Sequence, residues 1–179
     1  VNNGGGMYCI DNSDPELTNV TITGNSASDK GGGIYLFLTN TILENNSIYN
    51  NYASRGGGMY LIQSNPYIIN CEISNNEVSY RAAAIYFSRS DAKLINCHLE
   101  NNLTTSPSSI ASHSLYFWCS CPDIIKSTII SEADVTGSTF GAYFSCNEDD
   151  VDDPSGSNHL LSCAEVNSSY WDISIGGSG

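Results

Sequence analysis

The sequence predicts an all-β fold, a parallel β-helix (β-solenoid) of about five to six coils. Three observations carry this prediction: a glycine–tyrosine phrase returns at a steady spacing, a second phrase with strand-like alternation returns between its copies, and no long window has helical spacing. A steady period of this length is typical of stacked repeats. Strands this short cannot bury a core within one repeat, but parallel coils stacked roughly 4.8 Å apart can share one.

The glycine–tyrosine phrase opens each expected coil. It reads Gly-Gly-Gly-Met-Tyr at residues 4–8 and returns, with increasing change, near residues 31, 56, 82, 112 and 139. Because the triplets follow the repeat, they indicate close-packed turns rather than a nucleotide-binding loop. The tyrosines of the phrase are 27, 25, 26, 30 and 27 residues apart and are Tyr8, Tyr35, Tyr60, Tyr86, Tyr116 and Tyr143.

The second phrase predicts two short strands separated by a bend. It reads Leu-Thr-Asn-Val-Thr-Ile at residues 17–22, and further copies begin at residues 43, 68, 94 and 124. Apolar and polar residues alternate until the alternation slips at the asparagine of the phrase. Asparagine tolerates the left-handed backbone, so we expect the bend there. Three prolines, four residues before this bend column, suit the first position of a strand, where a missing N–H is tolerated: Pro15, Pro66 and Pro122.

The alternation of GGG[I/M]Y with [L/I]-x-N-x-x-[I/L]-x-x-N resembles the repeats of right-handed parallel β-helix proteins of the pectin-lyase-like superfamily. It is most similar to the repeats of polymorphic outer-membrane and other large surface or secreted proteins. The resemblance covers residues 1–132 well and residues 133–170 loosely. It implies a right-handed coil, in agreement with the general handedness of parallel crossovers. It implies adhesins, fibres, polysaccharide lyases and glycoside hydrolases alike.

One β-helix domain, residues 1–170, is therefore expected, followed by a tail or linker at 171–179 that ends Gly-Gly-Ser-Gly. The columns expected to face inward are apolar in every clear coil, as at Met7, Ile34 and Met59. No amphipathic cap precedes the first coil. We therefore expect the chain either to continue a longer solenoid or to associate end to end with another copy.

The tyrosine column lies between two inward columns, so a regular strand would point it outward. Three interpretations are open: the rings stack on one another along the coils, they pack on a partner chain, or they bind sugar rings. A second outward column is apolar where water is expected, which indicates a covering loop or partner. It consists of Ile69, Ile95 and Ile125.

Two polar columns accompany the repeat. Half of the six basic residues directly precede the glycine phrase, and they are Lys30, Arg55 and Arg81. Like charges on neighbouring rungs repel, so we expect them to pair with carboxylates, which outnumber bases nineteen to six, or with an anionic ligand. An amide column at a turn is expected to form a hydrogen-bonded ladder that stabilises the turn, rather than a ligand site. Its members are Asn25, Asn51, Asn76 and Asn102.

Seven cysteines are many for a cytosolic chain of 179 residues and favour an extracellular or cell-surface location. Three disulfides are candidates, although connectivity does not follow from sequence alone. For one pair, on an inward column, two buried thiols are an equally good solution. The candidate pairs are Cys119 with Cys146, Cys121 with Cys163, and, with the thiol alternative, Cys71 with Cys97.

Charge and hydropathy exclude several classes of binding partner. A net charge of −13 argues against nucleic acid and against anionic membrane surfaces. No segment is long and apolar enough to span a bilayer, and no signal peptide is recognisable. Self-association, continuation into a longer solenoid, and polysaccharide remain as expected partners.

The dense acidic run at residues 147–153 is either a solvated loop or a calcium site, because Ca²⁺ prefers clustered hard oxygens. Its aspartates are Asp149, Asp150, Asp152 and Asp153. The sequence indicates no cofactor unless this run binds calcium. Four N-x-[S/T] sequons, about the number expected by chance, would accept glycans in a eukaryotic secretory route. They begin at Asn19, Asn45, Asn102 and Asn167.

No catalytic constellation stands out. The aspartates of the clear coils occupy turns at different repeat positions, so no carboxylate pair faces one groove, as glycoside hydrolysis requires. His98, in an outward column beside Glu72, reads as an ordinary surface histidine. The sequence thus predicts a non-enzymatic structural or adhesive building block of a rod or fibre. The alternative is a polysaccharide-binding module, or a polysaccharide lyase or hydrolase, that uses the tyrosine column, the basic column and the acidic run.

Overall fold

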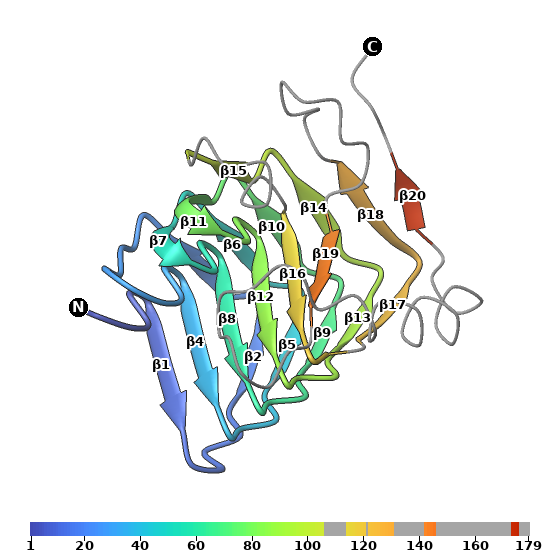
Figure 1. Cartoon of the computed structure of the whole chain (residues 1–179). Helices are drawn as coiled ribbons and strands as arrows, with labels where there is room; N and C mark the ends of the chain where they lie inside the picture. Colours follow the sequence, from blue (N-terminus) through green and yellow to red (C-terminus); the bar gives the residue numbers. More distant parts are fainter. Residues whose placement is uncertain (106–113, 121, 131–141, 146–172, 176–179) are drawn as a thin grey trace.

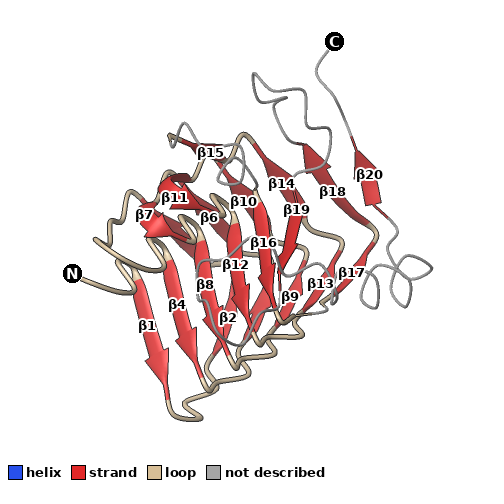
Figure 2. Ribbon diagram, in the orientation of Figure 1, coloured by secondary structure: helices blue, strands red, loops and turns tan. Residues whose placement is uncertain are grey.

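The computed structural model describes residues 1–105, 114–120, 122–130, 142–145 and 173–175. Within these residues the regular elements are all strands, and they wind as a parallel β-solenoid (Figures 1 and 2). The predicted all-β, parallel β-helix fold class is confirmed. In the described part of the chain, no helix has the length and apolar character needed to cross a membrane.

The glycine–tyrosine phrase builds the first sheet. Each strand begins three residues after the expected start of its coil, and the tyrosines of successive coils are direct register partners. The sheet has six parallel strands in this order: β1 (Met7–Ile10), β4 (Ile34–Phe37), β8 (Met59–Ile62), β12 (Ile85–Ser88), β16 (Leu115–Trp118) and β19 (Ala142–Ser145).

The second phrase builds two further sheets, one on each side of its asparagine bend. The second sheet contains β2 (Glu16–Thr18), β5 (Ile42–Glu44), β9 (Tyr67–Ile69), β13 (Lys93–Ile95) and β17 (Asp123–Ile125). The third sheet contains β3 (Thr21–Thr23), β6 (Ser47–Tyr49), β10 (Glu72–Ser74), β14 (His98–Glu100), β18 (Ser127–Ile130) and β20 (Ile173–Ile175). A short fourth sheet, which leads back to the glycine phrase, contains β7 (Tyr52–Arg55), β11 (Glu77–Arg81) and β15 (Leu103–Thr104).

Two details of the predicted organisation differ. Between β1 and β16 the chain makes four full turns, slightly fewer than the five to six coils expected, and β17 to β20 extend the same sheets. The expected tail at 171–179 contains β20, which pairs in parallel with β18. Its Ile-Ser-Ile sequence has the strand period of two, a signal too short to stand out beside the glycines that follow.

The bends between the second and third sheets confirm the role assigned to asparagine. All five bend residues have left-handed backbones, with φ of 57°, 55°, 52°, 53° and 49°. Asparagine adopts this conformation at lower cost than most residues, because its short polar side chain bonds locally. They are Asn19, Asn45, Asn70, Asn96 and Lys126.

The glycine triplets combine a left-handed backbone with close packing. Gly31 and Gly56 have φ of +65° and +62°. A Cβ on Gly33 would lie 2.7 Å from the carbonyl oxygen of Gly58 in the next coil. The triplets therefore let the backbones of neighbouring coils approach, as expected of repeat-periodic glycine.

The main core fills the space between the first three sheets. It is formed by the predicted inward columns, and its members are fully buried from the second coil onward, as at Ile34, Leu43 and Ile48. Burial of such side chains is the main stabilising term available to a stack of short strands. The apolar columns predicted to face inward are therefore confirmed.

Candidate functional site

The tyrosine column forms a continuous stack on the outer face of the first sheet. Successive ring centroids from Tyr8 to Tyr116 are 5.0, 5.9, 4.5 and 4.7 Å apart, and the rings lie nearly parallel. The interpretation that the rings stack on one another thus describes the structure. Tyr143 continues the column in the strand register.

This outward stack is mostly buried, which the alternation of the sequence does not reveal. Tyr8 is 52% exposed, but Tyr35, Tyr60, Tyr86 and Tyr116 are 7%, 5%, 2% and 1% exposed. They form a second apolar cluster, against which Phe37, Ile62 and Trp118 pack. Within the described column, Tyr8 is therefore the ring that offers substantial area to a ligand or partner.

Burial also fixes the charge state of two rings of the stack, Tyr35 and Tyr86. It raises the pKa of Tyr86 far above its usual range, and the neighbouring rings of Tyr60 and Tyr116 add to the rise. Burial likewise raises the pKa of Tyr35. The phenols of Tyr35 and Tyr86 stay neutral, so these two rings supply aromatic surface and hydroxyl groups rather than a base.

The basic column lies beside this stack. Lys30 Nζ is 3.2 Å from Asp29 Oδ2, and Arg55 Nη1 is 3.8 Å from Asp29 Oδ1. One carboxylate thus serves two rungs, and the predicted pairing with acids is confirmed for these two residues. Lys30 Nζ also lies 5.7 Å from the ring centroid of Tyr60, within cation–π range.

Arg81, the third member, is only 4% exposed and makes a different set of contacts. Its Nη1 donates to the hydroxyl of Tyr116 at 3.1 Å. Its guanidinium carbon lies 4.6 Å from the ring centroid of Tyr80 and 5.0 Å from that of Tyr116. Arg55 reaches the same Tyr80 ring at 5.4 Å. The basic column is thus tied to the aromatic face by cation–π contacts, which sequence spacing alone does not predict.

The predicted amide ladder is present and deeply buried. Asn51 Nδ2 donates to Asn76 Oδ1 at 3.0 Å, and Asn76 Nδ2 donates to Asn102 Oδ1 at 3.0 Å. Each Oδ1 also accepts the backbone N–H of the preceding rung, and each Nδ2 also donates to an isoleucine carbonyl there, as Asn76 does to Ile48 at 2.9 Å. Full satisfaction of these buried amides supports the prediction that they stabilise the turn.

A hydroxyl ladder, which sequence reasoning missed, lies at another corner. The backbone N–H of Thr39 donates to Ser64 Oγ at 3.2 Å, that of Ser64 to Ser90 Oγ at 3.1 Å, and that of Ser90 to Ser120 Oγ at 2.9 Å. The ladder begins at Asp14, whose carboxylate accepts from the Thr39 hydroxyl. Its members each follow a tyrosine by four residues, so the repeat did contain the signal.

The cysteine predictions have different outcomes. Cys71 and Cys97 are free, which corrects the candidate disulfide between them and leaves the alternative of two buried thiols. Each thiol instead lies within hydrogen-bond distance of a carbonyl of the preceding coil, at 3.4 Å for Cys71 and 3.2 Å for Cys97. Cys119 is not among the free thiols, and its suggested partner Cys146 lies outside the described residues. The pairing of Cys121 with Cys163 also lies outside them.

The structure separates the sequons. Asn19 and Asn45 are exposed at the bends, whereas Asn102 is buried in the amide ladder and its Nδ2 donates to the Ile73 carbonyl at 2.8 Å. A glycan on Asn102 would break the ladder, so this sequon is incompatible with the fold. Asn167 lies outside the described residues.

The remaining candidates for chemistry are sparse. His98 is the register partner of Glu72, as expected from the sequence, and its Nε2 lies 3.3 Å from Glu100 Oε2 on the outer face of the third sheet. No group of three or more His, Cys, Asp or Glu side chains in the described ranges is placed to hold a metal ion. The acidic run Asp149, Asp150, Asp152 and Asp153 falls outside those ranges, so the calcium prediction stays a prediction.

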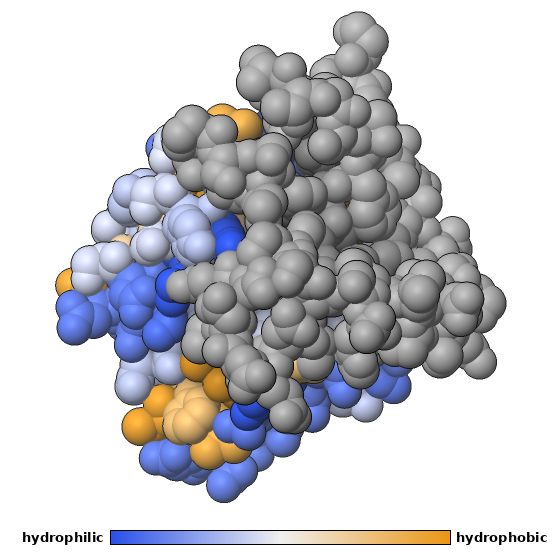
Figure 3. Space-filling view, in the orientation of Figure 1, coloured by the Kyte–Doolittle hydropathy of each residue, from blue (hydrophilic) through white to orange (hydrophobic). Residues whose placement is uncertain are grey.

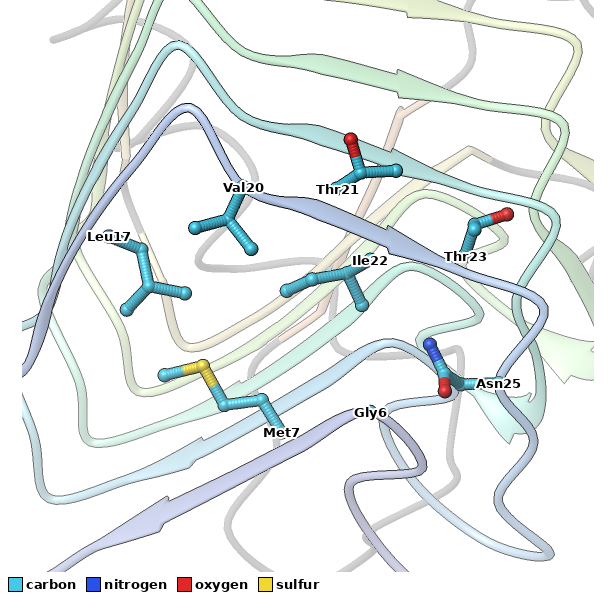
Figure 4. Close-up of a pocket in the computed structure, with 8 residues that line it drawn as sticks. All are labelled: Gly6, Met7, Leu17, Val20, Thr21, Ile22, Thr23 and Asn25. Atoms are coloured by element: carbon cyan, nitrogen blue, oxygen red, sulfur yellow. The ribbon is translucent and has the colours of Figure 1, made fainter.

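The N-terminal end of the solenoid carries a cavity of about 440 Å³ (Figure 4). Its walls are core positions of the first coil, among them Met7, Leu17, Val20 and Ile22. In the close-up these side chains converge from β1, β2, the bend that follows β2, and β3, and Asn25 lies at one side. The cavity is therefore the open end of the main core.

The arrangement defines the class of protein: a parallel β-solenoid whose coils are joined by buried ladders of amides, hydroxyls and aromatic rings. Residues 1–129 match the family model described as the right-handed β-helix region, so the chain belongs to the right-handed β-helix family. The predicted resemblance to right-handed β-helix repeats is thereby confirmed. No curated protein and no solved structure shows a significant match to the chain.

Proposed function

We propose that this right-handed β-helix is a structural segment of an extracellular or cell-surface protein, a stiff building block of a rod or fibre with an adhesive role. The observation that carries the proposal is the buried amide ladder, in which Asn51 and Asn76 bond to the rungs on both sides. Bonds of this kind run along the solenoid axis. They resist separation of the coils, which is the load that a rod must bear.

The outer surface supports the same role. Most of the aromatic column is used in internal stacking, so its rings stiffen the first sheet. The exposed large apolar side chains of the described residues include Tyr8, Ile10 and Leu38, near the first coils, where Figure 3 shows apolar surface. An exposed apolar patch is typical of contact with another macromolecule.

The rival enzymatic or sugar-binding role has weaker support. It relied on the tyrosine column, on the basic column and on the acidic run at residues 147–153, which lies outside the described residues. Four of the five described rings are buried, and Lys30 and Arg55 share Asp29. Apart from Tyr8, little of these two columns faces a ligand.

The proposal has two separable tests. Antibodies against the chain should label intact, unpermeabilised cells of the source organism, and labelling only after permeabilisation would overturn the surface location. Purified chain incubated with a panel of acidic and neutral polysaccharides should release no reducing or unsaturated sugar ends. Release that persists through repeated purification would overturn the structural role and favour the lyase or hydrolase.

A further inference from the structure

We propose that the outer face of the second sheet binds the same face of a second copy of this chain, so that two solenoids lie side by side and antiparallel. The inference rests on the proposed structural role and deepens it by naming a partner and a surface. The central strands of this sheet, β5, β9 and β13, each have a paired strand on both sides. The face therefore belongs to the middle of the solenoid (Figure 1).

The face is apolar at its centre. In β5, β9, β13 and β17 the middle residue enters the core, so the first and third residues point outward. Ile42 and Tyr67, both first residues, are 37% and 45% exposed. The third residues Ile69, Ile95 and Ile125 are register partners in successive coils and are partly exposed. This isoleucine column joins Ile42 and Tyr67 in one apolar patch, and such patches are typical of contact with another macromolecule.

Charges of opposite sign flank the apolar centre along the solenoid axis. The first two strands of the sheet carry Glu16 and Glu44, whereas Lys93 lies on β13 and the exposed Lys126 follows β17. Lys93 Nζ lies 3.8 Å from Asp123 Oδ2, so one positive charge remains in excess at this end. Glu16, Glu44 and Lys126 have no ion-pair partner among the described residues. The face thus has an acidic half and a basic half.

This distribution of charge selects both the partner and its direction. In an antiparallel pair related by a two-fold axis near Tyr67, the acidic half of each copy faces the basic half of the other, and the apolar centres meet. In a parallel pair Glu44 would lie near its own equivalent, and so would Lys93, which costs free energy. The face is therefore complementary to itself in the antiparallel direction, which makes a second copy the matching occupant.

A pair of charge reversals tests the interface between two chains. Sedimentation velocity over about a hundredfold range of concentration should show reversible association of the native chain. Glu44→Lys and Lys93→Glu should each weaken it at least about tenfold, because like charges then face each other. An equimolar mixture of the two variants should recover the native association, since opposite charges face each other again. Glu77→Lys, the same change on the outer face of the fourth sheet, is the control and should leave association unchanged.

Three results would overturn the interface. They are a native chain that stays monomeric over the whole range, equal weakening by Glu44→Lys and Glu77→Lys, and a mixture of Glu44→Lys with Lys93→Glu that associates no better than its components.

A second pair of variants serves if a charge variant does not fold, as judged by circular dichroism. Tyr67→Ser removes the central ring of the face, and Tyr52→Ser removes a ring of similar exposure, 41%, from the fourth sheet. Tyr67→Ser should weaken association at least about tenfold and Tyr52→Ser should not, so equal association of the two variants would contradict the proposal. No readout depends on surface labelling or on sugar release, so this interface and the structural role fail independently.

Discussion

Removal of the Asn76 amide is the sharpest test of the ladder. In Asn76→Ala four hydrogen bonds disappear: two accepted by Oδ1 from Asn51, and two donated by Nδ2 to Ile48 and Asn102. Asn51 Nδ2 keeps its bond to a carbonyl of the first coil, and Asn102 Oδ1 keeps the Asn76 N–H. A net value of about 1 kcal/mol for each lost bond predicts a destabilisation of about 4 kcal/mol.

Urea unfolding followed by circular dichroism measures this loss. With a denaturant dependence of about 2 kcal/mol per molar urea, the midpoint should fall by about 2 M. Asn76→Asp keeps the size of the side chain but places a carboxylate against the Ile48 carbonyl and the Asn102 amide oxygen. We expect it to be at least as destabilised at neutral pH, because an unpaired buried charge is more costly than a missing amide.

Asn65→Ala is the matched control. Asn65 is exposed and its Oδ1 accepts one backbone N–H, from Asp91 at 2.7 Å, so its removal should cost less than about 1 kcal/mol. A loss below about 1 kcal/mol for Asn76→Ala, or equal losses for the two alanine variants, would refute the view that the buried amides hold the coils together.

Three further predictions concern other columns. Thr41 is fully buried, directly precedes β5 and stands where the coils on both sides have proline, so Thr41→Pro should raise the free energy of unfolding by about 0.5–1 kcal/mol. Thr39→Pro removes the N–H that is bonded to a serine hydroxyl and should lower the free energy of unfolding. A higher melting temperature for Thr39→Pro than for Thr41→Pro would contradict this account. Burial raises the pKa of Cys97 from 9.0 to about 12. The neutral thiol therefore makes its full contribution to the free energy of unfolding below pH 9, and that free energy should fall by about 1.4 kcal/mol per pH unit between pH 9 and pH 12. Urea titrations at pH 8 and 10 should show a smaller loss of unfolding free energy for Cys97→Ser than for the native chain. An equal loss in the two proteins would exclude this thiol as the cause. Gly24 has φ of +68°, and a Cβ added there would meet no heavy atom within 4 Å. Later coils have asparagine at this position, so Gly24→Asn should leave the free energy of unfolding unchanged or raise it slightly in the same assay. A loss above about 1 kcal/mol would show that these turns are not equivalent.

The repeat made most of the fold predictable. A position in one coil becomes a column in the stack, so the apolar columns, the bend at Asn45 and the ladder at Asn51 followed from spacing. The hydroxyl ladder was equally periodic, but its members change from threonine to serine. Small hydroxyl residues are common in ordinary turns, so the pattern did not stand out.

The candidate site was less predictable than the fold. Alternation decides whether a side chain faces the core or the outside of its own sheet, but not whether something covers the outside. Tyr86 illustrates the difference, because it points outward as predicted and is nevertheless buried. The strands of the first sheet are nearly continuous apolar runs, as in β12, Ile-Tyr-Phe-Ser. Such runs are typical of parallel strands buried on both faces.

The lengths of successive coils show which part of the repeat the ladders control. From the tyrosine to the amide ladder the segments are 17, 16, 16 and 16 residues long, whereas from the ladder to the next tyrosine they are 10, 9, 10 and 14. The longest, from Asn102 to Tyr116, leaves the register intact, since Ile85 still pairs with Leu115. The first segment before the ladder has one residue more than the others, and Asn25 still donates to Asn51, whereas the segments after the ladder differ by up to five residues. Loops that vary in length are where proteins most often change their contacts. The segment after the amide ladder is therefore where this solenoid can acquire new surface while the amide ladder stays intact.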